Sequence, residues 1–267
     1  ELPTYIINLD LAPEERFKEV ATFYKEPIQF LIDYYLNLMP AFVMDIFEKM
    51  EPFMKTLQHE HYMEVKGIAD VLGLPMSQAL YLNYIYELQA YCTSAVVRSA
   101  DGTVMHSRNL DFPNADQMRD ITYKAEFKKD GKVLFHAVQF AGTIGLYTGL
   151  KEGAFSISEN DRQTKITVAK ILDNLEMMFK GYDEVSWLVR DVLTTCDDFE
   201  CAMNNFIAHP LITPAYLIVA GVQPYEGAVI SRDKFGAAHI EMLSEERWYV
   251  FQTNDDHYNG ECQGRCQ

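Results

Sequence analysis

The chain lacks several features by which large classes of protein are known. No run of 18 or more apolar residues occurs, so we expect no helix that crosses a membrane. Only 23 residues are basic against 39 acidic, and the formal net charge of −16 argues against nucleic acid as a partner because its phosphates would be repelled. The 14 glycines are scattered and build no phosphate-cradling loop. What remains is a folded chain of 267 residues, 48% hydrophobic, which can bury one sizeable core.

Signals for the secretory route are also missing. The first residues, Glu1-Leu2-Pro3, have neither the charged region nor the apolar region of a signal peptide, and no Asn-x-Ser/Thr sequon occurs. We therefore expect that the numbering begins after a signal has been removed, or that the protein is cytosolic. The acidic composition suits solubility at low pH, a property that many other soluble proteins share.

Metal-binding patterns are scarce. His59 and His61 lie two residues apart and do not share a helical face, and no His-Glu-x-x-His occurs. The five cysteines are Cys92, Cys196, Cys201, Cys262 and Cys266. The last two are close enough to close a small disulfide ring or to form half of a metal site, but no second pair of suitable spacing stands out. We favour the disulfide and expect no metal and no cofactor.

The spacing of apolar residues predicts a helical first third. Residues 12–90 read mostly as helices, with an apolar stripe at steps of three and four from Ile28 to Met50 that is interrupted at Pro40. Further helices are predicted over 60–72 and from Ser77 to about Ala90.

After residue 92 the period changes to two. Antiparallel strands are predicted over 94–98, 103–107, 121–127, 132–138, 214–221, 227–232, 237–242 and 247–253. Helices are predicted between the two groups of strands, over 165–180, 183–195 and 197–206. This order favours an α+β protein in which two antiparallel sheets pack between helical layers.

One segment carries the chemistry. Cys92 opens a short apolar strand, an Asp101-Gly102 turn reverses the chain, and the returning strand carries Arg108 and Asp111. This geometry returns both charges to the start of the first strand, close to the Cys92 sulfur and backbone nitrogen. If the bond between Tyr91 and Cys92 were cut, the new α-amine would act as the thiol's own general base. Taken singly, these residues also fit a buried inert cysteine, a surface arginine and a turn aspartate.

These motifs resemble the acid ceramidase and N-acylethanolamine acid amidase family of N-terminal-nucleophile hydrolases. The resemblance rests on Cys92-Thr93-Ser94 and on Arg108-Asn109-Leu110-Asp111 at the family's spacing, and it extends to shorter stretches over 3–11, 66–69, 86–88, 140–142, 148–149, 226–233 and 248–254. It implies an αββα four-layer sandwich. It also implies that Cys92 is the nucleophile, that Arg108 holds the thiolate or the substrate oxygen, and that Asp111 orients the α-amine.

The resemblance implies two further site residues. Asn254 corresponds to the asparagine of a Thr-Asn-Tyr-Asp stretch that supplies an oxyanion-hole donor, although Asp255 here replaces the tyrosine. Asp161 falls where the family carries glutamate before arginine, and Glu159 is its competitor. The family's Asp-Asp-Arg-Arg run after the asparagine is absent, and Arg265 is the nearest stand-in.

The function implied is that of a self-cleaving zymogen. We expect a helical noncatalytic alpha segment, 1–91, and a catalytic beta segment, 92–267, that stay associated as one compact unit after cleavage. The substrate class is a lipid amide, with N-acylethanolamine favoured and ceramide the alternative. An uncleaved, noncatalytic lipid-binding relative is the hypothesis of another class. We expect a lysosomal or secreted protein.

The helices over 27–54 offer a route for lipid access. Besides the core stripe they carry further apolar side chains, namely Phe30, Tyr34, Leu36, Met44 and Phe53. These suit peripheral contact with a membrane or lipid particle, and they equally suit a second packed face.

Overall fold

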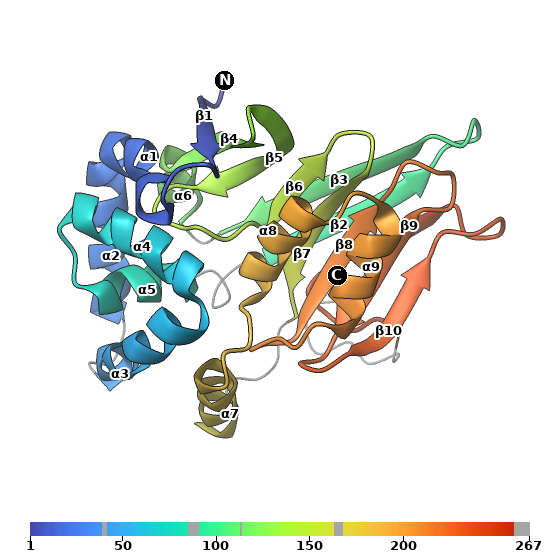
Figure 1. Ribbon diagram of the computed structural model, residues 1–267. Helices are drawn as coiled ribbons and strands as arrows, with labels where there is room; N and C mark the ends of the chain where they lie inside the picture. Colours follow the sequence, from blue (N-terminus) through green and yellow to red (C-terminus); the bar gives the residue numbers. More distant parts are fainter. Residues whose placement is uncertain (39–41, 85–90, 113, 163–167, 259–267) are drawn as a thin grey trace. The chain divides into compact units, whose positions relative to one another are not determined.

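The computed structural model describes residues 1–38, 42–84, 91–112, 114–162 and 168–258. The chain divides into two compact units (Figure 1). Unit 1 comprises Glu1–Gln89, Pro113–Gly145 and Met178–Gly181, and unit 2 comprises Ala90–Phe112, Leu146–Met177 and Tyr182–Gln267.

Unit 1 contains most of the helices that the sequence predicts. Its helical elements are η1 (Pro13–Glu15), α1 (Lys18–Phe23), α2 (Lys25–Leu38), α3 (Phe42–Leu57), α4 (His59–Leu72), α5 (Met76–Tyr84) and α6 (Ala115–Asp120). Three strands accompany them: β1 (Thr4–Asn8), β4 (Thr122–Lys129) and β5 (Lys132–Phe140). Strand β1 pairs parallel to β4, and β4 pairs antiparallel to β5.

Close packing in unit 1 depends on glycine and on one buried ion pair. Helix α4 lies so near η1 that a Cβ at Gly67 would stand 2.0 Å from the carbonyl oxygen of Glu14. The same helix ends at Gly73, whose left-handed φ of 74° lets its N–H bond the carbonyl of Ala69. Arg16 donates to the fully buried carboxylate of Glu64 at 2.7 Å, which compensates the cost of burying that charge.

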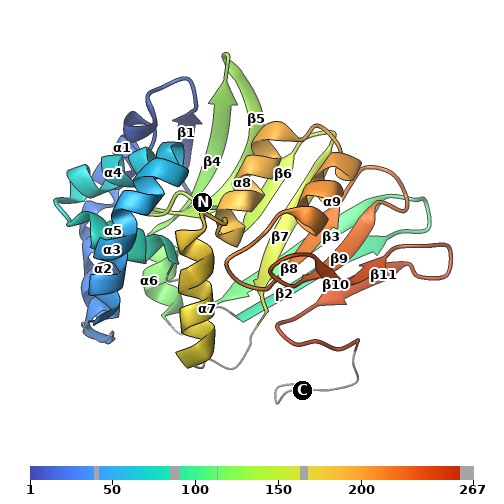
Figure 2. The ribbon, with the colours of Figure 1, turned by 60° about the horizontal axis from the view of Figure 1, so that its bottom comes forward.

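Unit 2 contains two antiparallel sheets. The larger runs in the order β6 (Thr148–Lys151), β7 (Phe155–Asp161), β8 (Ala215–Ala220), β9 (Gly227–Arg232) and β10 (Ala237–Met242). The smaller runs in the order β11 (Tyr249–Gln252), β2 (Tyr91–Arg98) and β3 (Val104–Asp111). Helices α8 (Val185–Thr195) and α9 (Phe199–Ala208) cover one face of the larger sheet (Figure 2). Helix α7 (Val168–Phe179) precedes them in the chain.

The two sheets of unit 2 enclose an apolar layer. Its members all come from inward-facing positions of the strands or from the loop after β10: Val96, Tyr216, Ile218, Ala220, Val229, Leu243 and Val250. Glycine permits the close approach, because a Cβ at Gly227 would stand 2.8 Å from a methyl of Val96 on the opposite sheet. Along β2 the inward positions read Cys92, Ser94 and Val96, so the apolar layer gives way to polar side chains toward the start of the strand.

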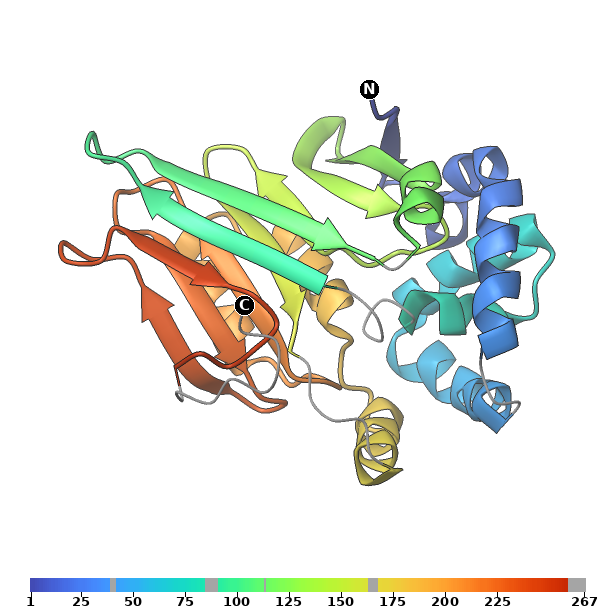
Figure 3. The same cartoon turned by 180° about the vertical axis from the view of Figure 1, so that it is seen from behind.

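The expected elements are largely present, and the described part of unit 2 has three layers. The mixed α+β class is confirmed, and so are the strands over 94–98 and 103–107. Strands β1, β6 and β7 and helix α6 were not predicted. Figure 3 shows the smaller sheet from the side opposite α8 and α9, and no helix of the described residues of unit 2 covers that face. The interruption expected at Pro40 lies outside the described residues.

Each compact unit is assembled from separate stretches of the chain. Residues 113–145, which contain α6, β4 and β5, belong to unit 1 with the N-terminal helices. The sheet pairing of β1 with β4 explains this grouping, since it joins the first residues of the chain to a strand beyond residue 120. A cut before Cys92 remains a prediction.

Candidate active site

The hairpin of β2 and β3 carries three residues of the predicted site, Cys92, Arg108 and Asp111. Gly102 adopts a φ of 88°, and the carboxylate of Asp101 accepts hydrogen bonds from Ser99 and from the amide of Thr103, so the turn is fixed locally. The resulting register pairs Tyr91 with Asp111, Cys92 with Leu110 and Ser94 with Arg108. Residues directly opposite one another share a face of an antiparallel pair.

Cys92 faces the interior of unit 2. Its residue surface is 4% exposed, and it takes part in no disulfide. Its backbone N–H donates a hydrogen bond to Oδ1 of Asn254 at 2.7 Å. That nitrogen is the atom that a cut before Cys92 would turn into an α-amine, so Asn254 already holds the proposed general base.

Asn254 lies two residues beyond β11 and is buried. Its Nδ2 donates to the backbone carbonyl of Asp161 at 2.6 Å. A backbone N–H on one side and a carbonyl on the other fix which end of the amide is oxygen and which is nitrogen. Because Nδ2 carries two hydrogens and Asp161 accepts one, the second remains to serve the oxyanion role that the resemblance implies.

Arg108 lies on the same face of the hairpin as Cys92. Its Nε donates to Oγ1 of Thr148 at 2.9 Å and its Nη1 donates to Oδ1 of Asn160 at 3.2 Å. These bonds hold the guanidinium between the sheets, one diagonal step from Cys92. The structure therefore brings Arg108, Cys92 and Asn254 to one end of the layer between the sheets.

Asp111 lies on the other face of the hairpin. Its residue is exposed, it stands opposite Tyr91, and its Oδ2 accepts a hydrogen bond from the side chain of Asn109 at 2.7 Å. The register returns Asp111 to the start of β2 as expected, but alternation turns its side chain away from the side of the Cys92 thiol.

Asp161 contributes its backbone to the site. Its carbonyl receives Asn254, and the alternation of β7 directs Glu159 and Asp161 to the face opposite that of Asn160. Glu159, the competitor, is 1% exposed. Neither carboxylate shares the face of β7 that meets Arg108.

Asn160 is the central residue that sequence reasoning missed. It is fully buried, and its Oδ1 accepts from Ser94 Oγ at 2.8 Å as well as from Arg108. Its Nδ2 donates to the carbonyls of Gln252 at 2.9 Å and Thr253 at 3.2 Å. One amide thus joins strand β2, Arg108 and the segment that carries Asn254. An alternation count along 155–161 would have placed Asn160 inward, but no strand was predicted there.

His106 continues this polar cluster between the sheets. Its Nδ1 and Nε2 each lie 2.9 Å from a hydroxyl, Ser156 and Ser158 respectively. Ser158 donates its proton to Ser94, so Nε2–H donates to Ser158 and the bare Nδ1 accepts from Ser156. Burial, followed by the charge of Arg108, lowers the pKa of His106 to about 4, in keeping with a neutral ring.

The structure describes two of the four remaining cysteines. Cys196 and Cys201 form a disulfide with a Cα–Cα distance of 5.5 Å, which joins the end of α8 to α9. Cys262, Cys266 and Arg265 lie outside the described residues. Within the part of the chain that the structure describes, no group of three or more His, Cys, Asp or Glu side chains is arranged to hold a metal ion.

No single described helix is both long and apolar enough to cross a membrane, and only the bent pair Lys25–Asn37 and Phe42–Leu57, taken together, has that length and composition.

The chain is similar to proteins of known name over almost its whole length. A family profile described as the beta subunit of N-acylethanolamine-hydrolyzing acid amidase matches residues 1–61, so that description's subunit labels differ from the alpha and beta of our expectation. The chain is 33% identical to rat N-acylethanolamine-hydrolyzing acid amidase over 96% of its own length and 71% of the relative's. It is 31% identical to rat acid ceramidase over 96% and 71%.

A solved structure extends the likeness to the fold. The N-acylethanolamine-hydrolyzing acid amidase ortholog of Caenorhabditis elegans matches with a TM-score of 0.58 and 33% identity, over 63% of this chain and 72% of that one. Identity of this size across almost the whole sequence reflects common descent. The chain belongs to the family of N-acylethanolamine acid amidase and acid ceramidase, whose members hydrolyse amide bonds.

Proposed function

We propose that this chain is a self-cleaving cysteine amidase of lipid amides, with Cys92 as its nucleophile. The observation that carries the proposal is the 2.7 Å hydrogen bond between the backbone nitrogen of Cys92 and Oδ1 of Asn254, beside Arg108 on the same face of the hairpin. The arrangement places a thiol, its future amine and a cation together at a buried position.

In the first stage the Cys92 sulfur attacks the carbonyl carbon of Tyr91. The peptide C–N bond breaks, the nitrogen takes a proton, and the acyl group of Tyr91 is carried as a thioester on Cys92. Water then cleaves the thioester and leaves a free carboxylate on Tyr91 and a free thiol and α-amine on Cys92. Tyr91 is 37% exposed, whereas Cys92 is 4% exposed, so the bond lies where an exposed residue meets a buried one.

In the second stage the α-amine takes the thiol proton and the thiolate attacks the substrate amide. Arg108 stabilises the thiolate, because a nearby guanidinium lowers the pKa of a thiol. Asn254 keeps the amine oriented through Oδ1 and offers its second Nδ2 hydrogen to the oxyanion, an interaction worth roughly 3 kcal/mol for one such donor. The leaving amine takes the proton from the α-ammonium, and water releases the fatty acid from the thioester.

Exposed apolar side chains of unit 1 suit a protein that acts on a lipid amide. Of the five apolar side chains noted on the helices over 27–54, Phe30 is 57% exposed, Phe53 47% and Tyr34 43%. Exposed aromatic side chains on amphipathic helices suit contact with a membrane or lipid particle. The disulfide suits a lysosomal or secreted protein, where oxidising conditions preserve such bonds.

Mass spectrometry after acid incubation tests the first stage. The wild type should give two fragments, 1–91 and 92–267, whereas Cys92→Ala should stay whole. Ser107→Ala, which alters an exposed neighbour on β3, should cleave like the wild type. A wild-type chain that stays whole under all conditions would instead favour the noncatalytic lipid-binding relative.

Turnover of N-palmitoylethanolamine against ceramide tests the substrate. We expect the cleaved wild type to prefer N-palmitoylethanolamine, because the connection from Phe112 to Ile121 is short, whereas ceramidase carries a longer insert there. A preference for ceramide would move the chain to the other branch of its family without changing the mechanism.

A further inference from the structure

Two segments of unit 2 are joined side by side next to Cys92. The first, 160–162, ends β7, and the second, 252–256, follows β11. Asn160 Nδ2 reaches the carbonyls of Gln252 and Thr253, and Asn254 Nδ2 reaches the carbonyl of Asp161. The third connection is an ion pair, in which Arg162 Nε and Nη2 meet Asp256 Oδ1 and Oδ2 at 2.8 and 2.7 Å.

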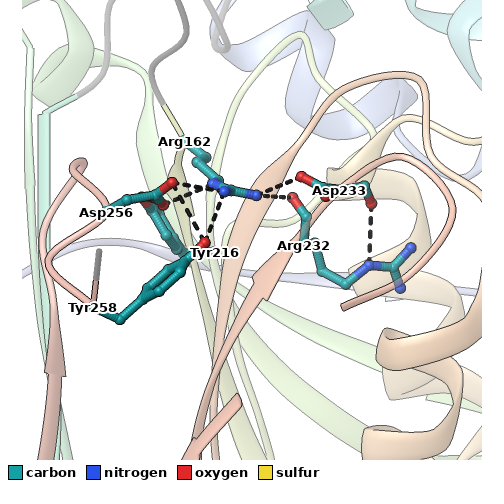
Figure 4. A network of polar contacts seen from close by, with 6 residues as sticks. All are labelled: Arg162, Tyr216, Arg232, Asp233, Asp256 and Tyr258. Atoms are coloured by element: carbon teal, nitrogen blue, oxygen red, sulfur yellow. Dashed lines mark hydrogen bonds and ion pairs between the residues drawn. The ribbon is translucent and has the colours of Figure 1, made fainter. Parts of the chain in front are cut away.

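Further hydrogen bonds fix both members of the ion pair (Figure 4). Tyr216, which points from the buried strand β8, donates its hydroxyl to Asp256. Arg162 also donates to the hydroxyl of Tyr258 at 3.0 Å and to the backbone carbonyl of Arg232 at 3.0 Å. A two-point guanidinium–carboxylate contact fixes orientation as well as distance, so it determines where the backbone of the second segment lies.

Arg162 faces two carboxylates that differ in exposure. The side chain of Asp256 is 22% exposed, whereas that of Asp233, bonded to Arg162 Nη1 at 2.7 Å, is 65% exposed. Charges shielded from water interact more strongly than exposed ones, so the Asp256 contact is the stronger one. The chain therefore contains its own matched control, a second aspartate on the same guanidinium that does not lie in the segment carrying Asn254.

We propose that Arg162 and Asp256 are positioning residues, which hold Asn254 in hydrogen-bonding contact with the backbone nitrogen of Cys92. Asn254 lies between Gln252, the last residue of β11, and Asp256, and no strand or helix fixes it. The Arg162–Asp256 pair anchors the far end of this short span, and Asn160 anchors the near end. The catalytic consequence rests on the proposed function, whereas the contact itself does not.

Acid does not release the pair. Burial by itself raises the pKa of Asp256, but the hydrogen bonds from Arg162 and Tyr216 outweigh it and leave that pKa below its ordinary value. The carboxylate thus stays ionised at mildly acidic pH, and the ion pair persists there.

Hydrogen exchange in an uncut chain tests the contact without any activity. In the Cys92→Ala background, the backbone amide at position 92 still donates to Asn254. Adding Asp256→Asn should speed the exchange of that amide by about tenfold, because local opening governs exchange of a hydrogen-bonded amide. Adding Asp233→Asn should leave it unchanged. Equal exchange in both double variants would overturn the proposal.

Kinetics in the cleaved enzyme separate positioning from stability. Asp256→Asn should lower kcat on N-palmitoylethanolamine by about tenfold to a hundredfold with KM unchanged, since it misplaces a group that acts in the transition state. Asp233→Asn should match the wild type, and Tyr216→Phe, which removes one hydroxyl, provides a milder variant should Asp256→Asn fail to fold. A wild-type kcat in folded Asp256→Asn would overturn the proposal. If the wild type neither cleaves nor turns over substrate, the exchange result stands alone and only the proposed function fails.

Discussion

Oδ1 of Asn254 lies 2.7 Å from the backbone nitrogen of Cys92, although 162 residues separate the two in sequence. The bond orients the backbone nitrogen of the proposed nucleophile in the uncut chain. Since Nδ2 of the same amide donates to the carbonyl of Asp161, the side chain is fixed at both ends.

Asn254→Ala should slow both self-cleavage and amide turnover by about a hundredfold to a thousandfold. The variant loses the acceptor for the Cys92 nitrogen and the donor for the oxyanion, and the loss of one oxyanion donor has that magnitude. Rates of fragment release and of fatty acid release measure the effect. Asn204→Ala, on the exposed face of α9, is the control and should match the wild type. Wild-type rates in Asn254→Ala would show that the contact has no catalytic part.

Arg108→Lys should be nearly as damaging as Arg108→Gln, with a loss of about a hundredfold in kcat. Lysine keeps the positive charge but loses the planar fork that meets Thr148 and Asn160 at once. Steady-state kinetics and the pH dependence of thiol alkylation at Cys92 measure this effect. Full activity in Arg108→Lys would mean that charge alone matters. Arg119→Gln, at an exposed ion pair with Asp116, is the neutral comparison.

His106 should make the fold less stable as the pH falls. Its pKa drops from 6.5 in the unfolded chain to about 4 in the fold, so between these values the unfolded state binds more protons. The contribution of neutral His106 to the free energy of unfolding is therefore fully present above pH 6.5. It is lost as the pH falls toward 4, by about 3 kcal/mol in all. Urea unfolding at several pH values should show that the free energy of unfolding of His106→Gln depends less steeply on pH between these values. His59→Gln, at an exposed position, should run parallel to the wild type.

Removal of the Cys196–Cys201 disulfide should lower the free energy of unfolding by about 2 kcal/mol, the scale expected for a loop of this length. The double variant Cys196→Ser, Cys201→Ser should therefore unfold at lower urea concentration than the wild type. An unchanged unfolding midpoint in urea would contradict this prediction. Activity at a permissive temperature should persist, because the bond joins α8 to α9 and contains no residue of the site.

Much of the site could be foreseen from the hairpin. The Asp-Gly turn and the period-two pattern predict the register, and the register alone places Arg108 on the face of Cys92 and Asp111 opposite Tyr91. Register alone does not bring both charges to the sulfur. Successive residues on a strand face opposite ways, and Asp111 is turned outward. Asn160 was missed because β7 was not predicted as a strand.

The sequence by itself determined the hairpin and the family and predicts the nucleophile, since turn chemistry and strand alternation act over a few residues and are visible in a single chain. The tertiary structure decided which atom each partner offers: the backbone carbonyl of Asp161, the amide of Asn160 and the carboxylate of Asp256. Those contacts join strands from two packed sheets, and packing between sheets leaves no period in the sequence from which it could be predicted.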